Sequence, residues 1–281
     1  MVNTKISENQ YDEIVKLYKN GSSSVEIAAL YGVTHKTITK ILDKKGVQRR
    51  NGGCRKYGLN EEYFDNIDTP NKAYILGFLY ADGSNTENKC TISMSLQEED
   101  GYILEKIRQE IGSEKPLEFL DYSNKHDGGY NYKNQYRLLM FSRHMCEALK
   151  EKGVVPNKSL ILQWPTFLRD DLYSHFLRGY IDGDGYIQPH KWEHCVDFIS
   201  TYDFCKNAQD YIESKLGIKC RLDDASCHNG ITTYLYIRHK EQVKQFLDYI
   251  YQDAELYLTR KYQTYISKYC MDENINNTQV A

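Results

Sequence analysis

Two aspartates in the sequence end similar apolar stretches, and a glycine follows each of them. Asp82 lies in AYILGFLYADGS (73–84), and Asp184 lies in HFLRGYIDGDGYI (175–187). If two such helices pack together, both carboxylates meet at helix C-termini, which already carry partial negative charge. A divalent cation relieves this repulsion, and hard oxygen ligands suit Mg²⁺. The pair therefore predicts a metal site for Mg²⁺, with Mn²⁺ as a substitute.

Small residues recur four positions apart in both stretches. They are Gly77 and Ala81 in the first copy, and Gly179 and Gly183 in the second. Residues at this spacing share one face of a helix, and small ones allow two backbones to approach closely. We therefore expect Gly77 and Gly179 to pack the two helices together. The glycine after each aspartate predicts a left-handed helix end.

The two stretches open two copies of one unit, at 61–165 and 166–270, before a tail at 271–281. Patterns of apolar residues predict the same order of elements in both copies. In the first copy these are a strand at 89–96, a helix at 101–112, a strand at 132–141 and a helix at 143–152. In the second they are a strand within 194–200, a helix at 206–216, a strand at 232–238 and a helix from Glu241. Lys158 follows Asp82 by 76 residues, and Lys261 follows Asp184 by 77.

Residues 1–46 predict a small helical domain of three helices. The first covers 10–20, Ser24 can cap the second, and Thr34 can cap the third. The phrase EIAALYGVTHKTITKIL resembles a helix-turn-helix of the recombinase or repressor type. The resemblance implies that the third helix enters the DNA major groove. The outward residues would be Thr34, His35, Lys36, Thr37 and Lys40. The alternative is a helical bundle with a solvated basic face.

Residues 47–60 mix glycine with basic side chains, including Arg49 and Arg50. This linker could follow the DNA phosphates or could be a solvated connector. The formal net charge of the 281 residues is −3, but residues 1–58 hold eleven Lys/Arg against five Asp/Glu. Basic charge is thus concentrated at the N-terminal end, so the larger part must gather its cations on one face to bind DNA.

The remaining composition limits the class of protein. Eight cysteines occur without a CxxC pair, which favours free thiols in a reducing compartment over a zinc site. No apolar run approaches the length that spans a bilayer, and the first residues lack a signal-peptide core. We expect a cytoplasmic protein without a membrane partner, encoded by a microbe or phage, or acting in an organelle.

The segments ILGFLYADG (75–83) and LRGYIDGDG (177–185) resemble the nonapeptide that defines the LAGLIDADG homing endonuclease family. The resemblance implies an α+β fold: two αββαββα units in one monomeric chain, with the motif helices at a pseudo-two-fold axis and a saddle of antiparallel sheets. The all-α helix-turn-helix domain would precede them. The alternative is an ordinary amphipathic helix with an Asp-Gly cap.

In this fold, the polar faces of the strands would contact the major groove of double-stranded DNA. Unlike halves in one chain can recognise an asymmetric site. The strand residues expected to contact DNA are Lys89, Thr91, Ser93, Lys133, Gln135, Arg137, Thr232, Tyr234, Tyr236 and Arg238.

The resemblance also implies phosphodiester hydrolysis by a nuclease of a mobile genetic element. Asp82 and Asp184 would hold the metal, with the carbonyls of Ala81 and Gly183 completing its coordination. Lys158 and Lys261 would then lie near the scissile phosphate and stabilise the transition state. Otherwise they are ordinary surface lysines. Where the second copy has Asp182, the first has Tyr80, and we expect Asp182 to cap or pack.

Two other functions use the same scaffold. One is a sequence-specific DNA-binding regulator that does not cut, which usually carries degenerate motifs. The other is a maturase that assists intron RNA splicing, although a helix-turn-helix favours duplex DNA over the deep, narrow groove of RNA. An intein is disfavoured, because splicing-junction residues are not found at the ends of the sequence.

Overall fold

The computed structural model describes residues 6–47, 57–123, 126–127, 130–224 and 232–270. The chain divides into two compact units at Gly58 and Leu59. In the described part of the chain, every helix is too short or too polar to cross a membrane.

The smaller unit consists of α1 (Tyr11–Lys19), α2 (Ser24–Leu30) and α3 (His35–Lys44), preceded by the short turn η1 (Glu8–Gln10). Its core is formed by Ile14, Ile27, Ile38, Ile41 and Leu42. This bundle confirms the predicted helices. The predicted cap at Ser24 is wrong by one residue, because the Ser23 side chain accepts from Glu26 N and Glu26 bonds back to Ser23 N.

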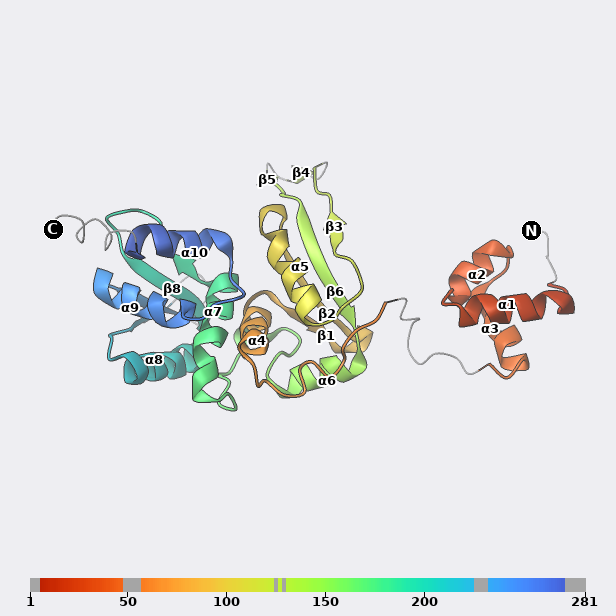
Figure 1. Ribbon diagram of the computed structural model, residues 1–281, viewed down its shortest axis with the longest axis horizontal. Helices are drawn as coiled ribbons and strands as arrows, with labels where there is room; N and C mark the ends of the chain where they lie inside the picture. Colours follow the sequence, from red (N-terminus) through yellow and green to blue (C-terminus); the bar gives the residue numbers. More distant parts are fainter. Residues whose placement is uncertain (1–5, 48–56, 124–125, 128–129, 225–231, 271–281) are drawn as a thin grey trace, which may run out of the picture. The chain divides into compact units, whose positions relative to one another are not determined.

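The larger unit is built around two apolar helices, α4 (Pro70–Asp82) and α7 (Tyr173–Asp184), which pack against each other (Figure 1). Each helix is followed in the chain by the strands of one four-stranded antiparallel sheet. The strand orders of the two sheets, β1-β2-β6-β3 and β7-β8-β10-β9, are equivalent. The first sheet contains β1 (Ser84–Thr86), β2 (Thr91–Gln97), β3 (Glu118–Leu120) and β6 (Gln135–Phe141). The second contains β7 (Tyr186–Ile187), β8 (Cys195–Thr201), β9 (Arg221–Asp224) and β10 (Thr232–Arg238).

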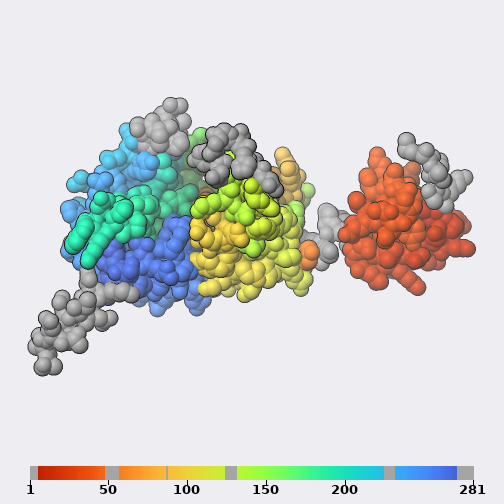
Figure 2. Space-filling view, turned by 90° about the horizontal axis from the view of Figure 1, so that it is seen from above, coloured from red at the N-terminus to blue at the C-terminus, as the bar shows by residue number. Residues whose placement is uncertain are grey.

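Further helices cover one face of each sheet and bury its apolar side chains (Figure 1). They are α5 (Gly101–Glu110) and α6 (Arg143–Glu151) in the first half, and α8 (Tyr202–Leu216), α9 (Lys240–Tyr251) and α10 (Thr259–Tyr265) in the second. Two further short strands, β4 (His126–Asp127) and β5 (Tyr130–Asn131), pair in antiparallel. Up to α9, each half has the order αββαββα, which confirms the predicted α+β fold class. The two halves meet directly in the space-filling view (Figure 2).

Glycines set the distance between the two central helices. A Cβ on Gly77 would lie 2.0 Å from the Phe176 carbonyl oxygen, and one on Gly179 would lie 2.0 Å from the Tyr74 carbonyl oxygen. The backbones are therefore in contact at this crossing, as the spacing of small residues predicts.

The left-handed ends predicted for these helices are wrong. Gly83 and Gly185 both have negative φ and extended backbone. Glycine is needed at these two positions for a steric reason. A Cβ on Gly83 would lie 2.6 Å from the Leu79 carbonyl oxygen, and one on Gly185 would lie 2.7 Å from Ile181 Cα. The chain turns so sharply into the sheet that no side chain fits beneath it.

Two predicted strands begin later than expected. Lys89 ends a 3₁₀ turn, η2 (Glu87–Lys89), and Cys90 after it has a φ of 49°, so β2 begins at Thr91. Lys133 precedes β6, which begins at Gln135. Both lysines therefore lie beside the sheet rather than on its strands.

Candidate functional site

Asp82 and Asp184 occupy the last positions of α4 and α7. The helices cross at Gly77 and Gly179 and stay close up to their C-termini, so their last turns are also in contact. A Cβ on Gly183 would lie 2.3 Å from Ala81 Cβ and 3.4 Å from Asp82 Oδ2. The Asp82 carboxylate thus lies against the final turn of the opposite motif helix.

The electrostatics of these two aspartates are unfavourable for two negative charges. Loss of hydration and then the charge of Asp184 raise the pKa of Asp82 to about 6, against the opposing effect of nearby lysines. Loss of hydration also raises the pKa of Asp184. Both residues still have exposed surface, so water and ions can reach them. The site therefore favours an added positive charge.

Lys158 lies behind the first aspartate, at the start of the 3₁₀ turn η4 (Lys158–Leu160). Its Nζ donates to the carbonyl oxygens of Ala81 at 3.0 Å and Gly83 at 2.7 Å. Burial lowers the pKa of Lys158, whereas the negative charges of Asp184 and Asp82 raise it. The lysine satisfies carbonyls that the end of α4 leaves without helical partners.

Lys261 takes the corresponding place in the second half, in the first turn of α10. Its Nζ donates to the carbonyl oxygens of Asp182 at 3.0 Å and Gly185 at 2.6 Å, and to that of Ile181. Burial lowers the pKa of Lys261 to about 8, and the charge of Asp182 opposes this shift most strongly. The matched spacing in the sequence thus brings a buried lysine to the end of each motif helix.

The oxygen atoms at this point fit a hard divalent cation better than zinc. The donors are two carboxylates and backbone carbonyls, without a thiolate or imidazole among them. Among the described residues, no three His, Cys, Asp or Glu side chains form a metal-binding group, so a cation at this point would need backbone carbonyls or water as further ligands. One expected carbonyl, that of Ala81, accepts a hydrogen bond from Lys158.

Beside the site lies a buried polar network around Asp182, a residue expected from the sequence only to cap or pack. Asp182 is 1% exposed, and its Oδ2 accepts from Tyr74 Oη at 2.9 Å and Leu258 N at 2.8 Å. Burial raises the pKa of Asp182 to about 6. Because Leu258 N-caps the helix that carries Lys261, this carboxylate joins the α4 side of the interface to the second lysine.

Arg178 extends the network and is fully buried. Its guanidinium donates to the carbonyl oxygens of Leu256 at 2.8 Å and Ile250 at 2.6 Å, and lies 3.0 Å from His175 Nδ1. Loss of hydration, then the charge of Arg178, lowers the pKa of His175 to about 4. The bonds of Arg178 to Leu256 and Ile250 thus hold the end of α9 and the α9–α10 connection against α7.

The face of the first sheet that the helices leave uncovered carries the expected polar residues. Thr91, Ser93, Gln135 and Arg137 are partly exposed. In β2 they alternate with buried apolar residues, and in β6 the residue between them, Tyr136, is half-buried. Arg137 Nε donates to Ser95 Oγ at 3.3 Å. Lys133 instead bonds Gln97 Oε1 at 3.0 Å from its place before β6.

The second sheet fits the expectation only in part. Tyr234, Tyr236 and Arg238 lie on its uncovered face, with the Arg238 guanidinium 4.7 Å from the Tyr236 ring. Thr232 is buried and therefore cannot contact a DNA groove. Asp197, which no sequence motif singled out, pairs with Tyr236 in register and places negative charge on this face.

The smaller unit exposes most of the residues expected on its third helix. Thr34, His35, Lys36 and Lys40 are exposed, and Thr37 is partly covered. Arg49 and Arg50 lie outside the described residues.

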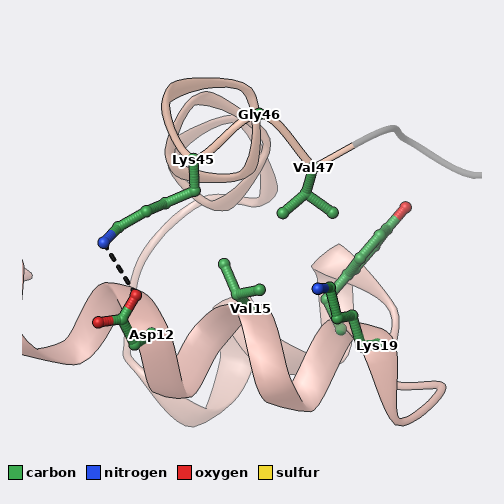
Figure 3. Close-up of a pocket in the computed structure, with 7 residues that line it drawn as sticks. Asp12, Val15, Lys19, Lys45, Gly46 and Val47 are labelled. Atoms are coloured by element: carbon green, nitrogen blue, oxygen red, sulfur yellow. Dashed lines mark hydrogen bonds and ion pairs between the residues drawn. The ribbon is translucent and has the colours of Figure 1, made fainter.

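A hollow of about 550 Å³ lies between α1 and the residues after α3 (Figure 3). Its lining combines Val15 and Val47 with the ion pair between Lys45 Nζ and Asp12 Oδ1, 2.8 Å apart. This ion pair and the valines pack the bundle, and they suggest no chemistry.

Comparison with known proteins agrees with this architecture. Residues 4–45 match the helix-turn-helix domain of resolvase, and residues 171–251 match a LAGLIDADG-like domain. The homing endonuclease I-WcaI bound to its DNA recognition sequence has a TM-score of 0.53 at 11% identity, covering 79% of this chain and 97% of that one. The chain therefore contains a resolvase-type helix-turn-helix and a LAGLIDADG-like domain.

Two further proteins are similar to part of this chain. Full-length DUF199/WhiA from Thermatoga maritima has a TM-score of 0.47 at 16% identity, covering 79% of this chain and 66% of that one. The glutamine–fructose-6-phosphate aminotransferase of Methanocaldococcus jannaschii is 26% identical over 191 residues, 60% of this chain. The match spans only 17% of that relative's length.

Proposed function

We propose that this protein is a metal-dependent endonuclease that recognises a long asymmetric site in double-stranded DNA and cuts both strands. The observation that carries the proposal is the meeting of Asp82 and Asp184 at the ends of two paired helices, with a buried lysine behind each. Structural packing alone does not require two carboxylates at this point, since their mutual repulsion is unfavourable.

In this proposal, the two carboxylates would hold Mg²⁺, which would supply an activated water and positive charge at the leaving oxygen. Oxygen from water forms a bond to phosphorus while the bond to the 3′ oxygen breaks, leaving a 3′ hydroxyl and a 5′ phosphate. Lys158 and Lys261 fix the ends of the motif helices and add positive charge beside the phosphate. The fold thus holds the two carboxylates and the two lysines in place before DNA binds.

The uncovered sheet faces would bind the duplex, because they carry the hydrogen-bonding and cationic side chains. We assign 61–165 and 166–270 as the two halves, and their differences, such as Ser93 against Asp197, suit an asymmetric site. Thr34–Lys40 would add a second contact in the major groove. The protein would act as a monomer, since one chain supplies both halves.

A regulator that binds DNA without cutting is the second candidate. One observation favours it: both lysines already donate to backbone carbonyls, and Ala81 O, an expected metal ligand, is one of their acceptors. Such lysines would be retained for stability in a protein that had lost catalysis.

A cleavage assay separates the two candidates. A duplex carrying the gene's own insertion site is incubated with the protein and Mg²⁺, and EDTA provides the metal-free reference. We expect a double-strand cut that Asp82→Asn and Asp184→Asn abolish, while the exposed Asp203→Asn on α8 retains it. Tight binding without any cut in Mg²⁺ or Mn²⁺ would support the regulator instead.

A further inference from the structure

The connection between β7 and β8, residues 188–194, presents an unusual side chain to solvent. Trp192 in this connection is 85% exposed, the highest value among the exposed large apolar residues of the described chain. The corresponding connection in the first half, residues 87–90, is shorter and reads ENKC, without an aromatic residue. The exposed indole therefore belongs to one half only.

The connection is held in place by several hydrogen bonds. Lys268 Nζ donates to the carbonyl oxygens of Gln188, at 2.7 Å, and Glu193. Gln188 Nε2 donates to Glu193 Oε2 at 2.7 Å, and Glu193 N donates to His190 O at 3.2 Å. These bonds fix the backbone on both sides of Trp192, so a partner that binds the indole has less loop entropy to remove.

The charges around the indole favour an anionic partner. Lys191 Nζ lies 5.2 Å from the centre of the Trp192 ring. Arg238 lies opposite Cys195, the first residue of β8 after the connection. The negative charge of Glu193 in the same connection is offset by Lys268, whose Nζ donates to the Glu193 carbonyl oxygen. Exposed apolar area beside cations suits the sugars and phosphates of DNA.

We propose that Trp192 and Lys191 form a separate contact with duplex DNA, beyond the strands of the second sheet. The indole packs on sugars and base edges, and Lys191 binds a neighbouring phosphate. This inference rests on the DNA-binding part of the proposed function and not on cleavage. Only the second half makes this contact, so it extends the recognised duplex on one side.

Binding in EDTA to a mixed-sequence duplex tests the contact without any need for cleavage. Trp192→Ala should weaken binding by about tenfold, because it removes the packing of the indole on the duplex, without changing the salt dependence. Lys191→Ala should reduce the slope of log affinity against log salt by about 1. Trp192→Phe, which retains an aromatic ring, should remain within about threefold of the wild type.

Phe167→Ala serves as the matched control. Phe167 is 48% exposed but lies near Asp68, beyond the opposite end of α4 from Asp82. Its removal should leave affinity unchanged. If Trp192→Ala and Phe167→Ala bind DNA equally well, the proposed contact is wrong.

Fluorescence gives an independent reading. The chain has two tryptophans, and the other, Trp164, is buried and stacked on Tyr173. The difference between wild type and Trp192→Phe therefore isolates the emission of Trp192. Duplex should protect this emission from acrylamide; a bound complex in which it stays fully quenchable would refute the contact. Protection without cleavage in Mg²⁺ would retain the contact and reject the endonuclease.

Discussion

Adding one methyl group at the crossing of the motif helices should separate them. In Gly77→Ala the new Cβ would start 2.0 Å from the Phe176 carbonyl oxygen, whereas carbon and oxygen normally approach to about 3.3 Å. The obstacle is backbone, so no side-chain rotation relieves it. Overpacking of this kind costs about 3 kcal/mol, and the better helix propensity of alanine returns about 1 kcal/mol. We expect a net loss of about 2 kcal/mol, and the same for Gly179→Ala.

Gly183→Ala provides the control for this reasoning. There the nearest atom is the Ala81 side-chain Cβ at 2.3 Å, which a second substitution can remove. Gly183→Ala alone should destabilise the protein, and adding Ala81→Gly should restore most of the loss. No side-chain substitution on α7 should rescue Gly77→Ala.

Tryptophan fluorescence during thermal unfolding is the suitable assay, because both tryptophans lie in the larger unit and the helix-turn-helix does not contribute. For a unit of this size, 2 kcal/mol corresponds to a fall in Tm of about 4–8 °C. An unchanged or raised Tm for Gly77→Ala would refute the close backbone contact.

Three further substitutions test the electrostatics, the buried network and the cap. Asp82→Asn should raise Tm at pH 8 and not at pH 4. In the folded state the pKa of Asp82 is raised to about 6, so the protonated carboxyl stabilises the fold below about pH 4, and this stabilisation is lost as pH rises through 6. The neutral amide removes the unfavourable charge that is present at pH 8. Equal effects at both pH values would contradict this. Tyr74→Phe removes a donor to the buried Asp182 and should cost about 1–3 kcal/mol in urea unfolding, whereas no loss would mean that the bond is immaterial. Ser23→Ala should destabilise the smaller unit by about 1 kcal/mol in unfolding followed by circular dichroism, whereas Ser24→Ala should leave its stability unchanged. A larger loss for Ser24→Ala than for Ser23→Ala would mean that Ser24 is the cap, as expected from the sequence.

The sequence predicts most of the fold because its signals are local and repeated. Small residues four positions apart specify the helix crossing, and nearly equal spacing from each aspartate brings Lys158 and Lys261 to the same place in both halves. The alternation in β2 and β10 likewise identifies strands and their inward faces. Such patterns depend on neighbours along the chain, which a sequence shows directly.

The features that were missed depend on contacts between distant segments. Asp182 bonds Tyr74 from the other half and Leu258 from a later helix, and no spacing rule connects the three. Thr232 is buried because the segment around Leu162 covers that end of its sheet. The partner of Thr232 in register is Thr201, whose hydroxyl donates to the Leu162 carbonyl oxygen. Lys89 leaves the strand because Cys90 adopts a left-handed conformation that its residue type does not predict.

The most direct test of the central claim is cleavage of a duplex labelled on each strand, with wild type, Asp82→Asn and Asp184→Asn compared in Mg²⁺. If the two carboxylates form one composite metal site, the wild type should cut both strands and leave 3′ hydroxyl ends, and either substitution should stop both cuts. The account would be contradicted if either variant cut both strands at the wild-type rate, because the paired carboxylates would then have no part in the reaction.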